Sequence, residues 1–217
     1  MNDVQTDNPA EQMIREQLLD RGITDMRVIE AIRAVPRDLF VPARQRENAH
    51  SPRPLAIGHG QTISEPYIVG LMTSALRVLP EHRVLELGTG SGYQTAVLAR
   101  LAKLVFTIER VKPLLDQAFD RLHQTGCSNV KLRHGDGTLG WPEEIPFDRI
   151  IITAAAPQVP AQLLLQQLSD GGIAILPAGP GQQQSLIRVL RSGNKLEQDE
   201  LCLCRFVPLI GKEGWPE

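Results

Sequence analysis

The sequence predicts an α/β fold in which helices cover both faces of a mostly parallel sheet. From residue 83 onward, short runs of branched apolar residues alternate with stretches of helical periodicity. The first run, Val84 to Leu87, leads directly into a turn that contains Gly88, Gly90 and Gly92. Alternating strands and helices form βαβ units, which place parallel strands side by side. The predicted fold is therefore Rossmann-like and doubly wound, as in nucleotide-binding domains.

The residues before this sheet predict an N-terminal helical cap. Apolar spacing over residues 9–34 indicates two helices, with Gly22 ending the first and Thr24 or Asp25 capping the second. Four prolines then mark an irregular segment from Pro36 to Gly60. A third helix is expected to begin near Pro66, since proline is favoured in the first turn of a helix.

The remaining elements follow from the same periodicities, and the chain ends differently from its core. Residues 185–191, a turn at 192–194 and residues 201–208 predict an antiparallel hairpin on one edge of the sheet. The expected core strands are 84–87, 104–108, 130–133, 148–153 and 172–176, separated by helices at about 93–102, 112–124 and 160–168.

A length of 217 residues is typical of one domain with additions. We expect residues 1–80 to form the cap and its following loop, 81–180 the cofactor-binding core, and 181–217 the edge hairpin and tail. The N-terminus shows no basic-then-apolar signal segment, and no apolar run approaches 18 residues. These features predict a cytoplasmic protein that makes no contact with a membrane.

The composition argues against several other classes of protein. A net charge of −2 gives no basic surface for nucleic acid, and the locally basic stretch is interrupted by acids, which favours a solvated surface. Three cysteines without a CxxC pair argue against a disulfide framework and a zinc site, so no metal is expected. Cys202 and Cys204 lie two apart and should share one face of a strand as buried small hydrophobes. The arginines of the basic stretch are Arg33, Arg37, Arg44, Arg46 and Arg53.

The glycine turn predicts a site for an adenosine-bearing cofactor. Glycines at a strand-to-helix turn allow positive φ and a close approach of the ligand to the backbone. A dinucleotide fingerprint would require a third glycine where the chain has Tyr93. No lysine or arginine is present at the turn, which suits a cationic sulfonium cofactor better than a pyrophosphate. Glu86, Gly88 and Gly90 are the candidate contacts at this strand and turn.

Acidic residues end the next two strands. Glu109 follows the glycine turn by about twenty residues, where a carboxylate accepts hydrogen bonds from ribose hydroxyls. That role fits NAD and S-adenosylmethionine equally well. Asp136, between two glycines, can accept a hydrogen bond from the exocyclic amino group of adenine. On these residues alone a methyltransferase is favoured, while a nicotinamide-dependent oxidoreductase and a cofactor-binding module without catalysis stay open.

Four segments together resemble the protein-L-isoaspartate O-methyltransferases, over about residues 11 to 209. The most specific of the four is the Gly-x-Gly-Gln-Thr-Ile-Ser segment that ends at Ser64. The other three are the glycine turn, His134 to Gly137, and Ala154-Ala155-Ala156-Pro157. Two shorter segments, Val35-Pro36-Arg37 and Phe206 to Leu209, extend the likeness.

The resemblance implies roles for individual residues. Ser64 would be the active-site residue, in contact with both cofactor and substrate. The loop from Ala154 through Ala155 and Ala156 to Pro157 would bind the substrate backbone. The residues implied to contact the cofactor are Gln61, Thr62, Ile63, Ser64, Val69, Ser91, Glu109, Arg110, Asp136 and Gly137. Ile210 and Trp215 depart from the polar residues of eukaryotic members and receive no role.

The implied reaction is methyl transfer from S-adenosylmethionine to the free α-carboxylate of L-isoaspartyl residues in damaged proteins and peptides. The ester then closes to a succinimide, whose hydrolysis returns some normal aspartate. A main-chain carboxyl has a pKa of roughly 3.3–3.7 and is ionised at neutral pH, so neither a general base nor a metal is required. A monomer is favoured, and a methyltransferase of another substrate class is the alternative. In a purely structural interpretation, Ser64 caps the helix at Pro66.

Overall fold

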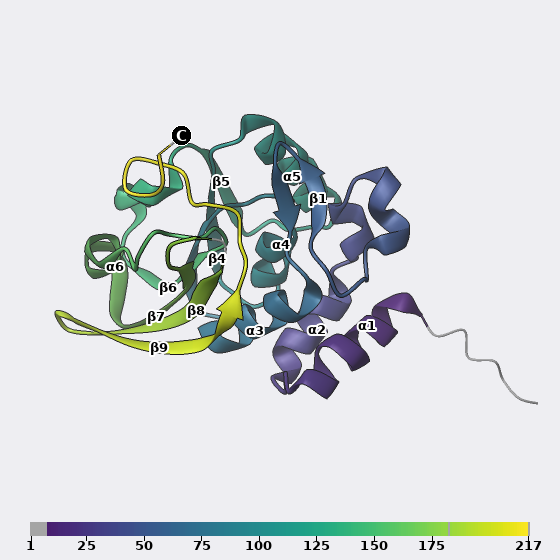
Figure 1. Cartoon of the computed structure of the whole chain (residues 1–217), viewed down its shortest axis with the longest axis horizontal. Coiled ribbons are helices and arrows are strands. Elements are labelled where there is room, and N and C mark those ends of the chain that lie inside the picture. The colour runs from purple at the N-terminus through teal and green to yellow at the C-terminus, as the bar shows by residue number, and fades with distance from the viewer. Residues whose placement is uncertain (1–7, 182, 217) are drawn as a thin grey trace, which may run out of the picture.

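Helices cover both faces of a seven-stranded sheet in the computed structural model, which describes residues 8–181 and 183–216 (Figure 1). The strand order is β5-β4-β3-β6-β7-β8-β9. The first five strands in this order are parallel, β8 pairs antiparallel with β7, and β9 pairs antiparallel with β8. The predicted fold class is confirmed. The strands are β3 (Arg83–Leu87), β4 (Leu104–Glu109), β5 (Val130–His134), β6 (Phe147–Ile152), β7 (Leu168–Ala178), β8 (Gln184–Ser192) and β9 (Lys195–Cys204).

The cap and core helices lie close to their predicted positions, although the helix expected at about 93–102 ends at Ala99. The side chain of Asp25 accepts a hydrogen bond from the Arg27 amide at 3.0 Å, so Asp25 caps the second helix. Gly22 takes a left-handed conformation after the first helical segment. The helices are α1 (Pro9–Gln17), α2 (Met26–Ala34), α3 (Pro66–Leu76), α4 (Tyr93–Ala99), α5 (Lys112–Gln124) and α6 (Ala161–Gln167). In the part of the chain that is described, no helix is both long and apolar enough to cross a bilayer.

Three strand predictions differ from the structure, and the first is β7, which begins at Leu168 and not at residue 172. The segment predicted as irregular contains β1 (Leu55–Gly58), which pairs with β2 (Gln61–Ile63) in a separate two-stranded sheet. The prolines that precede β1 favour an irregular segment, so the sequence pattern of so short a strand is not recognised. The second hairpin strand begins at Lys195, not at residue 201, and ends at Cys204. As the edge strand it carries exposed charged residues in its first half, and these hide the apolar alternation.

The sheet buries apolar residues on both faces, as a parallel sheet requires. Leu85, Phe106 and Ile150 pack against α6 on one face, whereas Val84 and Val105 pack against α3 and α4 on the other. Consecutive residues of the central strands thus alternate between two cores. The carboxyl ends of β3, β4 and β6 lie together at one edge, where the next loops meet.

Two side-chain predictions need correction. Arg37, predicted as a solvated surface residue, is only 1% exposed, although the other arginines of that basic stretch are exposed. Cys202 and Cys204 share one face as predicted, but both are half-buried rather than buried. They pack against the core cluster under α3, with Leu203 exposed between them.

Candidate functional site

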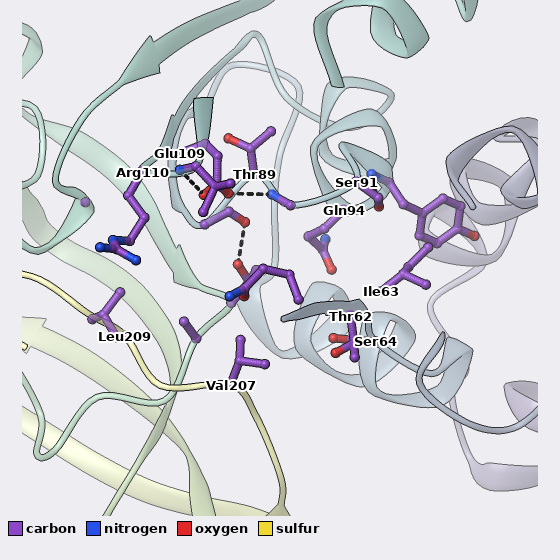
Figure 2. A pocket seen from close by; sticks show the side chains of 18 of the residues that line it. Thr62, Ile63, Ser64, Thr89, Ser91, Gln94, Glu109, Arg110, Val207 and Leu209 are labelled. Carbon is purple, nitrogen blue, oxygen red and sulfur yellow. Dashed lines mark hydrogen bonds between the residues drawn. The ribbon is translucent and has the colours of Figure 1, made fainter. Parts of the chain in front are cut away.

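A cavity opens at the carboxyl ends of β3, β4 and β6 (Figure 2). Six parts of the chain form its walls: β2 and its following loop with α3, the glycine turn with α4, the end of β4, Gly137 after β5, the residues after β6, and a C-terminal segment. The lining residues are Gln61, Thr62, Ile63, Ser64, Val69, Met72, Gly88, Thr89, Gly90, Ser91, Tyr93, Gln94, Ile108, Glu109, Arg110, Val111, Gly137, Thr153, Ala154, Val207, Pro208, Leu209 and Ile210.

The glycine turn has the backbone that the sequence predicts. Gly88, Gly90 and Gly92 have φ values of 101°, 54° and 87°, which residues with a Cβ rarely adopt. Space is also limiting at Gly88, where a Cβ would lie 2.5 Å from the Thr153 hydroxyl oxygen. The turn therefore presents bare backbone to the cavity, followed by the first residues of α4.

Glu109 connects the end of β4 to this turn. Its carboxylate accepts hydrogen bonds from the Gly90 amide through Oε2 and from the Val111 amide through Oε1, each at 2.8 Å (Figure 2). The residue lines the cavity and is only 6% exposed. The two amides fix the carboxylate in place, and each oxygen keeps a lone pair for a ligand.

Glu86 is placed differently from the prediction. It lies on the α4 face of the sheet with 0% exposure and does not line the cavity, so it is not positioned for direct contact with a cofactor. Its Oε2 accepts hydrogen bonds from Thr95 at 2.5 Å and Thr107 at 2.7 Å, and Oε1 has no partner among the described residues. Burial raises the pKa of Glu86 to about 8, and the hydroxyl hydrogen bonds oppose this only in part.

Asp136 binds the C-terminal tail of the chain. Its Oδ1 accepts from the Thr138 amide at 2.8 Å and the Thr138 hydroxyl at 2.7 Å, and Oδ2 accepts from the Lys212 amide at 2.8 Å. Burial raises its pKa, but these hydrogen bonds outweigh burial and hold the pKa below its usual range. Gly137 lines the cavity, whereas Asp136 lies just outside the lining.

Ser64, in the loop directly after β2, lines the cavity on the side opposite Glu109 and close to Thr62 of β2 (Figure 2). The N-cap of α3 is Glu65, and no side chain caps that helix. The capping role considered for Ser64 is therefore wrong. Its backbone carbonyl accepts a hydrogen bond from Arg37 at 2.6 Å.

The loop after β6 contributes less to the cavity than predicted. Ala154 lines it, but the backbone of Ala155 pairs with the C-terminal segment through Val207 and Leu209, at 2.7 and 2.8 Å. The amide of Ala156 donates to Pro177 at 3.0 Å. These groups are therefore not available to a substrate backbone, and neither Ala156 nor Pro157 lines the cavity.

Sequence reasoning missed several lining residues. Met72, Thr89, Gln94, Ile108, Val111 and Thr153 adjoin predicted contacts on the same elements, and helical or strand spacing could have indicated them. The C-terminal wall, Val207 to Ile210, depends on a long-range return of the chain. Trp215 supports that wall by donating its indole N–H to the Ala155 carbonyl at 2.9 Å. Among residues 8–181 and 183–216, no group of three or more His, Cys, Asp or Glu side chains is placed to hold a metal ion.

The fold and the site define an S-adenosylmethionine-dependent methyltransferase. A parallel sheet presents a glycine turn and an acidic strand end to one cavity, and Tyr93 replaces the third glycine of a dinucleotide site. Residues 8–214 match the family model described as protein-L-isoaspartate(D-aspartate) O-methyltransferase. The chain belongs to this protein-L-isoaspartate(D-aspartate) O-methyltransferase family.

Individual relatives agree with the family match. The chain is 49% identical over 213 residues to the protein-L-isoaspartate O-methyltransferase of Trichlorobacter lovleyi, covering 98% of each chain. It is 52% identical over 206 residues to protein-L-isoaspartate O-methyltransferase 2 of Marinobacter nauticus, covering 94% of each. A solved structure from Plasmodium falciparum shows a candidate enzyme of this type in complex with S-adenosyl-L-homocysteine. Its sequence is 26% identical to this chain and the TM-score is 0.80, and the match covers 94% of this chain and 99% of the Plasmodium chain.

Proposed function

We propose that this chain methylates the free α-carboxylate of L-isoaspartyl residues in damaged proteins and peptides, with Ser64 orienting that carboxylate. The observation that carries the proposal is the position of Ser64 across one cavity from the glycine turn and Glu109. The ester formed would close to a succinimide, and hydrolysis would return part of the product as normal aspartate.

The cavity fits S-adenosylmethionine, which supplies a methyl group on a sulfonium sulfur when bound. Glu109 is held by two backbone amides and still has lone pairs for both ribose hydroxyls. The glycine turn allows backbone contact with the amino acid part of the cofactor, and Ile63, Val69 and Met72 offer apolar contacts. Gln61, Thr62, Ser91, Arg110 and Gly137 complete the proposed contacts, with Asp136 supporting them through the tail.

The acceptor carboxylate is ionised at neutral pH, so the protein's task is to orient it. The Ser64 hydroxyl is a neutral donor that can hold one carboxylate oxygen without removing a proton. Orientation of two reacting groups contributes effective molarities of roughly 10⁵–10⁸ M, which is the main source of rate in such a site. We place the acceptor between Ser64 and Ala154, both of which line the cavity.

The cavity is lined by residues from the cap, the core and the C-terminal edge of a single chain. This supports the division into residues 1–80, 81–180 and 181–217 as parts of one domain. It also supports a catalytically competent monomer, which light scattering of the active protein would test. Isoaspartyl proteins are the proposed partners, with no role for nucleic acid.

Transfer of labelled methyl from S-adenosylmethionine to a synthetic isoaspartyl peptide tests the activity. Label on this peptide and not on the matched aspartyl peptide is expected, and equal labelling of both would refute the proposed specificity.

The variant Ser64→Ala tests the proposed residue. Loss of one hydrogen bond to a charged group, about 1.5–3 kcal/mol, should lower kcat by about 10- to 150-fold while cofactor affinity stays within about twofold. Ser74→Ala is the matched control, because Ser74 lies on α3 outside the cavity and its hydroxyl has no described partner. Full turnover by Ser64→Ala would exclude the assigned role.

A further inference from the structure

Arg37 is a buried cation that joins three separate segments of the site region. It begins a short 3-10 helix, Arg37–Phe40, between the cap and the sheet, and its side chain is 1% exposed. Its Nε donates to the Ala49 carbonyl at 2.8 Å, and its Nη2 donates to the Ser64 carbonyl at 2.6 Å. Its Nη1 has no hydrogen-bond partner among the described residues.

The same guanidinium contacts the helix that follows the glycine turn. Its central carbon lies 4.7 Å from the ring centroid of Tyr93, the first residue of α4, and Phe40 packs edge-on against that ring at 5.5 Å. Tyr93 also lines the cavity. One side chain therefore connects the Ser64 loop to the element that begins directly after the glycine turn.

Packing alone does not explain a cation at this position. Burial lowers the pKa of Arg37, and the Tyr93 side chain and, less, the Glu65 charge oppose this shift; Glu65 forms no ion pair with Arg37 in the described part of the chain. A buried charge without a paired acid is costly to desolvate, whereas an apolar side chain of similar length would fill the space without that cost. What the guanidinium adds is a rigid fork that holds two carbonyls and stacks on a ring.

We propose that Arg37 is a positioning residue, which fixes Ser64 relative to the glycine turn through the Ser64 carbonyl and the Tyr93 ring. The inference rests on the role proposed above for Ser64. A displacement of about 1 Å at a reacting group costs on the order of 100-fold in rate, so a fixed loop backbone has a large effect on turnover.

A double-mutant cycle between Arg37→Lys and Ser64→Ala tests this inference. Lysine keeps the charge but cannot hold both carbonyls, so we expect kcat for the isoaspartyl peptide to fall about 10-fold or more, with the Kd for S-adenosylhomocysteine within about twofold. In the Ser64→Ala background the same change should lower kcat by no more than about twofold, because the hydroxyl it positions is gone. A merely structural role predicts the same loss in both backgrounds.

Controls separate this inference from the proposed function and from a loss of fold. Arg83→Lys is the matched control, because Arg83 also donates to a backbone carbonyl and lies over an aromatic ring. It stands at the start of β3, at the opposite end of that strand from the glycine turn. Its effect on kcat should therefore be additive with that of Ser64→Ala. If Arg37→Lys does not fold, Arg37→Gln, which keeps one donor group and no charge, replaces it in the cycle with the same expectation. Additive losses overturn the inference alone, whereas an inert Ser64→Ala overturns the proposed role of Ser64 and the inference with it.

Discussion

Replacing Glu109 with glutamine should weaken cofactor binding and destabilise the glycine turn at once. The carboxylate accepts one backbone amide on each oxygen, from Gly90 and from Val111, both at 2.8 Å. In glutamine one oxygen becomes an NH₂ group, which donates and cannot accept from the amide that faces it. One of the two amides must therefore lose its partner, and the ribose hydroxyls meet a neutral group with one acceptor.

The magnitude follows from the charge and burial of this contact. Hydrogen bonds to charged groups contribute about 1.5–3 kcal/mol, and Glu109 is buried enough that solvent screening removes little of this. At about 1.4 kcal/mol per factor of ten, the Kd for the cofactor should rise about 10- to 150-fold. The same loss in the cofactor-free protein should lower Tm by about 3–12 °C for a chain of this size.

Isothermal titration with S-adenosylmethionine and with S-adenosylhomocysteine would measure the first effect, and a thermal melt the second. Asp116→Asn is the control, since Asp116 is an exposed acid on α5 that pairs with Lys112, away from the cavity. A Kd within twofold of the wild-type value, together with a lowered Tm, would show that Glu109 holds the turn but contacts no ribose. That result would refute the assignment at this strand end.

Three further changes have defined outcomes. Burial raises the pKa of Glu86 in the folded protein to about 8, so the folded protein keeps a proton that the unfolded chain releases above about pH 4.5. The contribution of Glu86 to the free energy of unfolding is therefore full below pH 4.5. It falls by up to about 1.4 kcal/mol per pH unit until the pH passes the folded pKa. The Tm should therefore change less between pH 5 and pH 8 in Glu86→Gln than in the wild type. An equal change of Tm in both proteins would contradict a neutral Glu86. Gly88→Ala should be about 1–3 kcal/mol less stable than Gly90→Ala in denaturant unfolding, because its Cβ would lie 2.5 Å from the Thr153 hydroxyl, whereas a Cβ at Gly90 would make an ordinary van der Waals contact with Ile57 at 3.7 Å; equal losses would contradict this. Asp136→Asn should weaken one tail hydrogen bond by about 1 kcal/mol, seen as faster amide exchange in residues 211–214, and unchanged exchange would show that the tail is held without it.

Periodicity predicted the sheet because burial on both faces leaves a strong local signal. It failed where distant parts of the chain decide the outcome. Arg37 follows Pro36 in a basic stretch and resembles a surface arginine until Ala49, Ser64 and Tyr93 close around it. The half-charged β9 strand is recognisable only once β8 is known to be its sole neighbour in the sheet.

At the site, local motifs predicted which segments meet but not where each side chain points. Glu86 adjoins the glycine turn in sequence, yet strand alternation turns it toward α4, where Thr107 lies directly beside it on the neighbouring strand. That pairing depends on the register of two parallel strands, which one sequence does not specify. The Ala154 to Pro157 loop was likewise predicted without the C-terminal segment that occupies its backbone groups.

The return of Val207 to Ile210 to the cavity has a consequence for how the protein matures. The Ser64 loop leaves the ribosome early, and the last wall of the site follows only after both strands of the edge hairpin. A nascent chain that has emerged as far as Ala178 contains the residues of the parallel strands and the glycine turn but lacks that wall. The complete cavity therefore forms only when residues 207–210 are in place, and proteolysis before Val207 would leave the site open on that side.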